Sequence, residues 1–431
     1  MGSVQKKRKA GIGAHVTNTN RDTIFSFIEK SDAIAIDLET GLCSYPAISP
    51  DSGGEGELEK CVFLEGWLRA QGITGLERFD APDSRAKGGV RPNLVATIPG
   101  GEGSEERGRF WIMSHIDVVP PGELSLWKSD PWKLEVSFGG KRITGRGVED
   151  NQQGLTSSVI AALALIKQGI RPSRTVKLLF ASDEENGSKY GIGWIIKNRP
   201  DLFSKNDLVL IPDAGSETGN IIEIAEKSQL WVKFVTKGQQ SHASTPERGA
   251  NAFLAGSDLA VRLHYGLSEK FSERDPLFEP DYSTFQPTKK EPNVPNINTI
   301  PGEDVFYYDM RILPRHPVDD VISEVDRIKA EVEKKHGVTI SYVIGQRNES
   351  PSTAPDSPLI QFLSKSVEEV YRVKTKNIGI GGGTFASFLR QIGIDCAVWS
   401  RLEHTAHQPN EYDLLDNILG DAKVMALMMI S

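Results

Sequence analysis

Histidines and acidic residues follow apolar runs of the sequence, at positions where buried strands are expected to end. They are His115 and Asp117 after residues 109–114, Glu184 and Glu185 after 175–181, Asp213 after 207–211, and His407 after 396–400. Ligands of open α/β sheets bind beyond the carboxyl ends of the strands, so neighbouring parallel strands would bring these side chains to one rim. Asp150 is a further candidate, because it lies in a glycine-punctuated turn just before a helix predicted from Gly154.

These side chains have the composition of a metal site. Two imidazoles and three or four carboxylates, with no cysteine, suit zinc, or cobalt or manganese where these are available. Each residue alone also has a structural explanation, since loop histidines and adjacent acids are common at surfaces and Asp213 is compatible with a turn. The chain has only eight histidines, however, and two of them follow predicted strands beside acids, which favours the metal site.

The elements that must position these residues alternate between strands and helices up to about Glu226. Short apolar runs at 109–114, 175–181 and 207–211 predict buried strands, and the Ala- and Leu-rich segment 154–167 predicts a helix packed on them. Strands separated by helices indicate βαβ units and a mostly parallel sheet.

The pattern changes near Lys227. The predicted elements there are, in order, a strand at 230–235, a helix at 251–267, a short strand at 296–300, a strand at 305–313, a helix at 318–335 and a strand at 338–344. This β-α-β-β-α-β order is the split-βαβ, ferredoxin-like arrangement. Residues 279–298 are rich in Pro and Asn and are expected to form a loop.

After Gly345 the α/β pattern resumes. The predicted elements are a helix at 357–371, a strand at 377–380, a helix at 384–392 and a strand at 396–400. We therefore predict an α/β catalytic domain, with a mostly parallel sheet flanked by helices, from residues 1–227 and 346–431. A smaller ferredoxin-like α+β domain at 228–345 is inserted in it, and residues 1–19 are expected to be a flexible tail.

Composition and charge exclude several classes of protein. Lys plus Arg is 50 and Asp plus Glu is 58, so the net charge of 50 − 58 = −8 argues against a nucleic-acid partner. The three cysteines, Cys43, Cys61 and Cys396, are far apart and odd in number, which fits a reducing compartment and a cytoplasmic location. The longest apolar helical stretch, 159–166, is too short for a membrane span, and the basic run at 6–9 lacks the apolar segment of a signal peptide.

Several short motifs together indicate a known family. They are Ser-His-Ile-Asp-Val-Val-Pro at 114–120, Trp-Lys-Ser-Asp-Pro-Trp-Lys-Leu at 127–134, Gly-Arg-Gly at 145–147 with Asp150, Asp-Glu-Glu-Asn-Gly at 183–187, Ser-His-Ala-Ser at 241–244, Asn-Thr-Ile-Pro at 298–301, Asp-Met-Arg at 309–311, Gly-Gly-Thr at 382–384, and the segment 407–411. In this order the chain, from about residue 20 onward, resembles the dinuclear-zinc metallopeptidases and amidohydrolases. That family includes aminoacylases, acetylornithine deacetylases, succinyl-diaminopimelate desuccinylases and carboxypeptidase G. The resemblance implies a zinc-peptidase-like catalytic domain, an inserted lid and dimerisation domain, and a homodimer.

The resemblance also implies roles for the residues of the rim. His115 and Asp213 would bind one zinc ion, His407 and Glu185 the other, Asp150 would bridge both, Asp117 would accept the second imidazole N–H of His115, and Glu184 would be the general base and acid. Two dications, three carboxylates and a bridging hydroxide sum to zero charge. Pairing two metal ions lowers the pKa of a shared water and polarises a carbonyl.

The inserted domain would supply the substrate contacts. By the same resemblance, His242 would stabilise the oxyanion, from its own chain or from a partner subunit. Arg311 and Asn298 would hold a substrate carboxylate, which a guanidinium fork fits, and the turn at Gly383 and Thr384 would add a backbone N–H and a hydroxyl. His404 receives no role.

The expected function is hydrolysis of N-acyl amino acids, as in the acetylornithine deacetylases and desuccinylases. A dipeptidase or carboxypeptidase of the same family stays open, because the sequence does not define the pocket. Two departures from many family members leave the substrate open as well: residues 151–154 lack the lysine found before the glycine, and Phe385 replaces an aspartate. A non-catalytic, small-molecule-binding relative would be expected to lack Glu184 or a metal ligand, and all are present. A serine hydrolase is disfavoured because the sequence has no Gly-x-Ser-x-Gly elbow.

Overall fold

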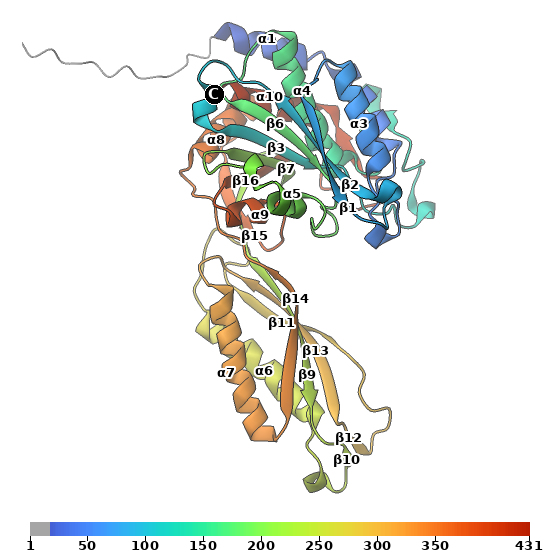
Figure 1. The fold of residues 1–431 in the computed structure, drawn as a ribbon, viewed down its shortest axis with the longest axis vertical. Helices are drawn as coiled ribbons and strands as arrows, with labels where there is room; N and C mark the ends of the chain where they lie inside the picture. Colours follow the sequence, from blue (N-terminus) through green and yellow to red (C-terminus); the bar gives the residue numbers. More distant parts are fainter. Residues whose placement is uncertain (1–17) are drawn as a thin grey trace, which may run out of the picture.

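The computed structural model describes residues 18–431 and shows two parts, a large α/β unit and an elongated smaller unit that projects from it (Figure 1). The basic run at 6–9 and most of the predicted flexible tail lie outside the described residues. Residues 18 and 19, assigned to that tail in the sequence analysis, already belong to helix α1.

The large unit is built on an eight-stranded sheet with the order β1-β2-β6-β3-β7-β16-β8-β15. The strands are β1 Leu76–Pro82, β2 Val90–Ile98, β3 Arg109–His115, β6 Thr175–Ala181, β7 Leu208–Ser216, β8 Ile221–Glu226, β15 Lys376–Ile380 and β16 Asp395–Arg401. Strands β6, β3, β7 and β16 pair in parallel, as do β8 and β15, whereas β1 and β2 form an antiparallel edge. The predicted mostly parallel sheet is confirmed.

Helices cover both faces of this sheet. They are α1 Asn18–Ile28, α2 Asp32–Cys43, α3 Leu58–Ala70, α4 Gln153–Lys167, α5 Ile192–Asn198, α8 Pro358–Tyr371, α9 Ala386–Gln391 and α10 Leu415–Ile430. Alternate residues of β3 point to opposite faces, so Ile112 packs with α4 and α10, while Trp111 and Met113 pack with α5 and α9. This alternation follows from the two-residue period of a strand.

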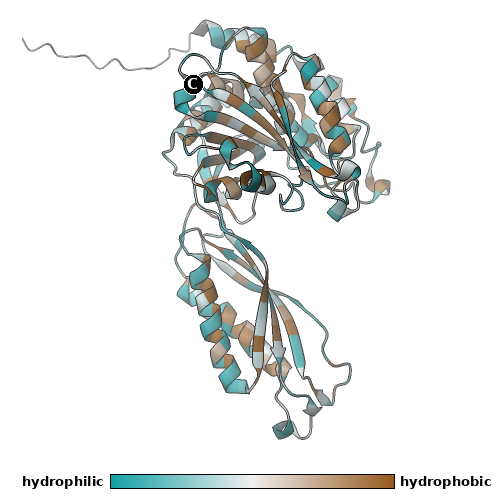
Figure 2. Cartoon of the chain, in the orientation of Figure 1, coloured by the Kyte–Doolittle hydropathy of each residue, from teal (hydrophilic) through white to brown (hydrophobic). Residues whose placement is uncertain are grey.

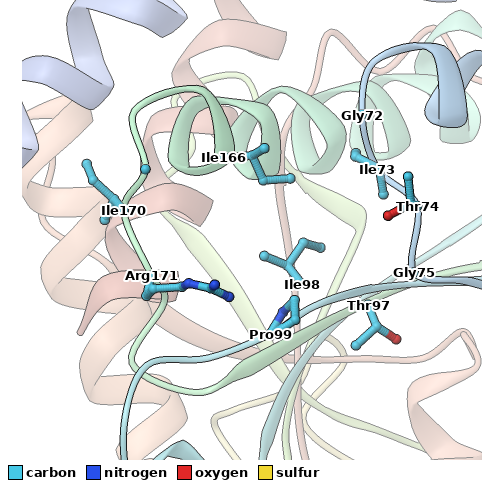
Figure 3. Close-up of a pocket in the computed structure, with 11 residues that line it drawn as sticks. Gly72, Ile73, Thr74, Gly75, Thr97, Ile98, Pro99, Ile166, Ile170 and Arg171 are labelled. Atoms are coloured by element: carbon cyan, nitrogen blue, oxygen red, sulfur yellow. The ribbon is translucent and has the colours of Figure 1, made fainter.

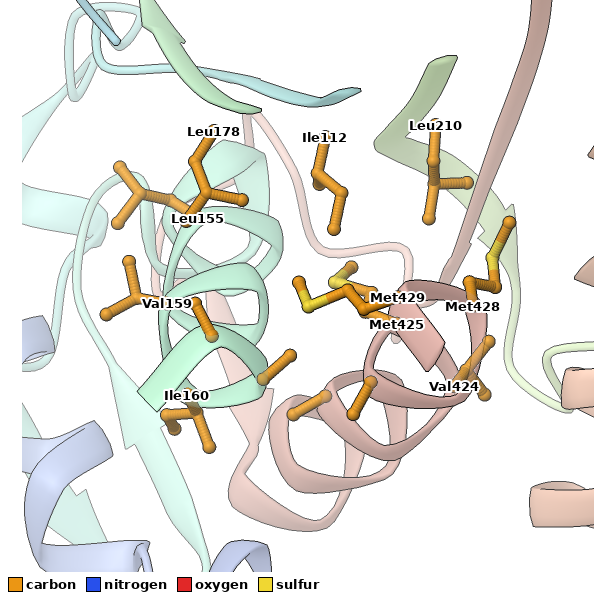
Figure 4. Close-up of a cluster of buried hydrophobic side chains, with 14 of the residues drawn as sticks. Ile112, Leu155, Val159, Ile160, Leu178, Leu210, Val424, Met425, Met428 and Met429 are labelled. Atoms are coloured by element: carbon orange, nitrogen blue, oxygen red, sulfur yellow. The ribbon is translucent and has the colours of Figure 1, made fainter. Parts of the chain in front are cut away.

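The core beneath the sheet is made by α4 and α10. Leu155 and Val159 of α4 lie beside Met425 and Met429 of α10, under Ile112 of β3 (Figure 4). In Figure 2 the apolar colour is concentrated on these inner strands and helices. Each large apolar side chain buried in this way contributes about 1.5–3 kcal/mol of transfer free energy, so this core holds the sheet rigid under the site.

The smaller unit has the predicted β-α-β-β-α-β order. Its elements are β9 Ser228–Lys237, α6 Ala252–Lys270, β11 Thr284–Lys290, β13 Glu303–Ile312, α7 Val318–His336 and β14 Thr339–Asn348. The sheet order is β11-β13-β9-β14 with antiparallel pairs, and both helices contribute to one apolar cluster with the strands. We call this segment, residues 228–348, the lid.

One predicted strand of the lid was misplaced. The sheet uses Thr284–Lys290, within the predicted loop, instead of the predicted strand at 296–300. β11 carries Pro287 beside a bulge on the sheet edge, and proline is tolerated at such positions although it weakens the sequence signal for a strand. The shorter strand β12, Thr299–Ile300, pairs instead with β10, Ser241–His242, at the far tip of the lid (Figure 1).

A small three-stranded sheet stands beside the carboxyl rim of the large one. It consists of β4 Glu135–Ser137, β5 Arg142–Thr144 and β17 Tyr412–Leu414. β5 leads directly into the turn that carries Asp150, and β17 follows the loop that carries His407. Among residues 18–431, no helix is both long and apolar enough to cross a membrane, and the three cysteines are buried free thiols.

Candidate metal centre

The carboxyl ends of neighbouring parallel strands bring the predicted rim residues together. His115 ends β3 and is in register with Ala181, the last residue of β6, so the acids that follow β6 start beside it. Asp213 lies within β7, on the other side of β3.

Asp150 lies between the two histidines. Its Oδ1 is 2.9 Å from Nε2 of His115, and its Oδ2 is 3.0 Å from Nε2 of His407. Nε2 of His115 is also 3.4 Å from Asp213 Oδ1, and Nε2 of His407 is 3.2 Å from Glu185 Oε1. The geometry thus forms two half-sites, each of one imidazole and one carboxylate, that share Asp150.

The donor atoms are close enough to hold metal ions. Ligand atoms of His115, Asp150 and Glu185 lie within 4.8 Å of one another, and so do those of His115, Glu184 and Asp213. Imidazole nitrogen and carboxylate oxygen without thiolate is a donor set of catalytic zinc and related divalent ions.

Burial and neighbouring charges shift the pKa values of these groups. Burial raises the pKa of Glu184 well above its ordinary value, and the Asp213 carboxylate raises it further. The hydrogen bond to Asp150, which has the larger effect, and the one to Glu185 raise the pKa of His407 to about 10. Burial also acts to raise the pKa of Asp150, but the hydrogen bonds to His115 and His407 outweigh it and leave this pKa below its ordinary value. The carboxylates of the rim thus favour positive charge between them, which divalent ions bound by neutral imidazoles would supply.

Asp117 supports both sides of the site. Its backbone carbonyl oxygen is 3.0 Å from Nδ1 of His115, and its carboxylate is further from this nitrogen, at 3.5 Å. The carboxylate instead accepts the backbone N–H groups of Glu184 and Glu185, both at 3.1 Å. Asp117 therefore meets the second imidazole nitrogen of His115 through its backbone carbonyl, while its carboxylate holds the backbone after β6.

Asn151 links three parts of the site and was not singled out from the sequence. Its side-chain oxygen accepts the backbone N–H of His115 at 3.3 Å, and its amide nitrogen donates to Asp213 Oδ1 at 2.9 Å. The same nitrogen donates to the carbonyl of Pro212. The residue after the bridging aspartate thereby fixes both ends of one half-site.

Two buried glutamates hold the loops that carry Asp150 and His407. The carboxylate of Glu411 accepts the backbone N–H groups of Gly147, Glu149 and Asp150 at 3.0–3.1 Å and pairs with Arg146 at 2.5 Å. The carboxylate of Glu149 in turn accepts backbone N–H groups of the His407 loop; the donors are Glu403, Thr405 and Ala406. These reciprocal contacts, which the sequence analysis did not identify, lock the two loops to each other.

A cleft of about 390 Å³ opens beside Glu184, between the large unit and the base of the lid. Its wall includes Gly383, Thr384 and Gln229. Arg311 of β13 reaches the same region, since its Nη1 donates to the carbonyl of Gly381 at 2.8 Å. The hydroxyl of Thr384 donates to Glu226 at 2.8 Å, so its proton is already used by a buried carboxylate.

Within one chain, the remaining lid residues lie far from the rim. His242 and Asn298 are exposed at the tip formed by β10 and β12, whose strands Figure 1 labels. Arg311 pairs with Gln229 at the start of β9 and so lies at the base of the lid. The ten residues of β9 separate base from tip, a span of about 30 Å for an extended strand. His404 is exposed in the loop before His407.

A second cavity, of about 500 Å³, lies at the opposite end of the sheet (Figure 3). It is formed by residues 72–75, the end of β2 and the end of α4 with Ile170 and Arg171. Its lining contains no histidine or acidic residue, so it lacks the groups for the chemistry of the rim.

The sequence profile of the peptidase family M20/M25/M40 matches residues 111–431. The chain belongs to this family. It is therefore a metal-dependent hydrolase of amides or peptides, as the donor set of the rim indicates.

Individual relatives agree with this membership. An uncharacterized metallohydrolase of Methanococcus maripaludis is 37% identical, with 90% of this chain and 97% of the relative covered. A succinyl-diaminopimelate desuccinylase of Sulfurovum sp. is 24% identical, with 89% and 95% covered.

Solved structures share the fold. Aminopeptidase PepT of Bacillus cereus has a TM-score of 0.74 at 18% identity, covering 92% of this chain and 98% of its own. The YXEP protein of Bacillus subtilis, described as a dinuclear metal-binding peptidase of family M20, has a TM-score of 0.63 at 15% identity, covering 93% and 98%.

The role of Glu411 gives a first prediction. Glu411→Gln places an amide NH₂ against backbone donors and leaves the buried Arg146 unpaired, which should lower the free energy of unfolding by about 3–5 kcal/mol. Because the turn that carries Asp150 loosens, the affinity for metal should fall about 10- to 100-fold, measured by competition with a coloured chelator. The exposed Glu106→Gln is the control and should change neither quantity. An unchanged metal affinity in Glu411→Gln would show that this clamp does not position the site.

Proposed function

We propose that this protein hydrolyses the amide bond of N-acyl amino acids at a dinuclear zinc centre, in the manner of acetylornithine deacetylases and succinyl-diaminopimelate desuccinylases. The observation that carries the proposal is the placement of Asp150 between His115 and His407, with Glu184 at the adjoining cleft. The similarity to a desuccinylase along most of the chain supports the assignment of the protein as a deacylase.

The donor atoms are assigned by their proximity. His115 and Asp213 would hold one zinc ion, His407 and Glu185 the other, and Asp150 both. Three carboxylates balance most of the charge of two dications. Such ions, when bound, supply a water of lowered pKa and polarise the carbonyl of the scissile amide.

Glu184 is the residue that moves protons. It is the one carboxylate of the cluster that lines the cleft and has no side-chain hydrogen bond to a histidine. The positive charge of bound ions would counter the burial that raises its pKa and keep it ionised, so that it could accept a proton from the attacking water. It then returns this proton to the nitrogen of the leaving amine. The backbone N–H bonds from Glu184 and Glu185 to Asp117 keep it in place.

The role of Glu184 gives a second prediction. Glu184→Gln keeps the shape of the side chain but cannot accept a proton, so kcat should fall by about 10²–10⁴-fold while the bound metal is retained. The measurement is turnover of N-acetyl amino acids together with metal content by elemental mass spectrometry. A metal-replete Glu184→Gln protein with near-normal turnover would remove Glu184 from this role.

A screen of N-acetyl, N-succinyl and dipeptide substrates defines the substrate class. Hydrolysis of an N-acyl amino acid in preference to dipeptides supports the proposed deacylase. Preference for dipeptides would identify a peptidase that uses the same rim.

The lid completes the site if two chains pair along it. Helix α6 presents Leu254, Val261 and Tyr265 to solvent, 56%, 56% and 68% exposed, and their spacing places them on one face. β11, which packs against α6, is an edge strand of the lid sheet. An apolar helix face beside an open strand edge is a surface that a second copy can cover.

The geometry of such a pair explains the distant lid residues. A two-fold axis across α6 and β11 would set two elongated lids side by side in opposite directions. The tip of each lid would then lie near the base of its partner, which brings His242 and Asn298 toward the rim of the other chain. His242 would donate to the developing oxyanion, and Asn298 would assist Arg311 and the N–H of Gly383 with the substrate carboxylate.

Mixing two inactive variants tests this arrangement, as a third prediction. His242→Ala and Glu184→Gln chains should each be inactive, but a mixed dimer has one rim with Glu184 and a partner that supplies His242. After subunit exchange, activity should recover to roughly a quarter of the wild type, because half of random dimers are mixed and each has one complete site. The control mixture of Glu184→Gln with Asp213→Ala has both lesions in the rim and should stay inactive. No recovery in exchanged His242→Ala and Glu184→Gln dimers would contradict a contribution in trans.

A further inference from the structure

Gln229, the second residue of β9, occupies the subsite that the proposed function gives to the substrate carboxylate. One atom of its side-chain amide lies 3.0 Å from Nη1 of Arg311 and 3.3 Å from the backbone N of Gly383, and because both neighbours are donors we assign this atom as the oxygen. The amide takes this orientation because the opposite one would place its NH₂ group against the same two donors.

Arg311 has few donors left for a ligand. Of its five N–H groups, those on Nε and Nη2 reach the two oxygens of Asp309 at 2.7 and 3.0 Å. The two on Nη1 go to the carbonyl of Gly381 and to Gln229. One N–H on Nη2 remains, whereas a bidentate carboxylate needs two. Removal of Gln229 would free one N–H on each terminal nitrogen, together with the N–H of Gly383.

Gln229 is held in this position from two sides. In this orientation the amide nitrogen of Gln229 lies 2.6 Å from the side-chain amide of Gln346 on β14, to which it can donate when the Gln346 oxygen faces it, and Gln229 is only 7% exposed. A Cβ atom on residue 383 would lie 2.9 Å from the amide atom of Gln229 that faces Arg311 and Gly383, so a side chain at residue 383 would push this amide aside. The contact is therefore built by residues of three separate elements, β9, β14 and the turn before α9.

We propose that Gln229 is a built-in occupant of the carboxylate subsite, which the substrate must displace, and that it thereby determines specificity. This inference rests on the proposed function, in which Arg311 and Gly383 bind a carboxylate. An ionised carboxylate forms stronger, charge-assisted hydrogen bonds than an amide oxygen, so it gains from the exchange. A neutral group would replace one amide-like acceptor by another and would gain almost nothing. The need to displace Gln229 therefore favours substrates that carry a carboxylate over neutral ones.

Calorimetric titration of metal-loaded protein tests the displacement. Turnover is blocked with Glu184→Gln, and the probes are N-acetyl-L-alanine and N-ethylacetamide, which is the same molecule without the carboxylate. With Gln229→Ala added, the dissociation constant of N-acetyl-L-alanine should fall about three- to tenfold. This change corresponds to the hydrogen bonds of Gln229 that the carboxylate no longer has to displace. Binding of N-ethylacetamide should not change. Gln229→Glu keeps the shape but adds a competing charge, so it should weaken N-acetyl-L-alanine about tenfold or more.

Controls keep the outcomes apart. Gln361→Ala, an exposed glutamine on α8, should leave both dissociation constants unchanged. Suppose that adding Gln229→Ala leaves the affinity for N-acetyl-L-alanine unchanged or lowers it, while the unaltered enzyme hydrolyses this compound. Gln229 is then not displaced, and this inference is wrong without affecting the proposed function. If the acid binds to none of the variants while other amides are hydrolysed, Arg311 holds no carboxylate, and the inference falls with that part of the proposed function. If no N-acyl amino acid is bound or hydrolysed, the proposed function itself is overturned.

Discussion

The site depends on one interaction, the contact of the two oxygens of the Asp150 carboxylate with the imidazoles of His115 and His407. Five carboxylates and two histidines gather at this rim, and such a concentration of buried negative charge is costly unless cations compensate it. Protonated histidines can do this in the free protein. Divalent ions would do the same and would also activate water.

The architecture serves to fix this contact. The parallel strands β3, β6 and β7 bring three groups of candidate metal ligands to one rim, and α4 and α10 hold those strands from below. The remaining two candidate ligands, Asp150 and His407, lie on loops, which would be mobile without support. Glu411 and Glu149 provide that support by accepting backbone N–H groups across the two loops. Burying both glutamates is tolerated because each carboxylate is satisfied by several donors.

Much of this could be predicted from the sequence, because strand ends carry a clear signal. The strand at 175–181 was predicted with its observed bounds, and the acids that follow it lie at the rim. The clamp of Glu411 was not predictable in the same way, since its partners are backbone N–H groups more than 250 residues earlier in the chain, which have no side-chain signature. β11 was missed because Pro287 interrupts the strand pattern at a position where the sheet edge tolerates it. The place of Gln229 depends on a contact between three elements, and neither periodicity nor motif reports such a contact.

The most direct test of the account is anomalous diffraction from crystals of the zinc-loaded protein, recorded on both sides of the zinc absorption edge. The account predicts two zinc peaks with the Asp150 carboxylate between them, one beside His115 and Asp213 and the other beside His407 and Glu185. A single peak, or two peaks of which neither contacts Asp150, would contradict it.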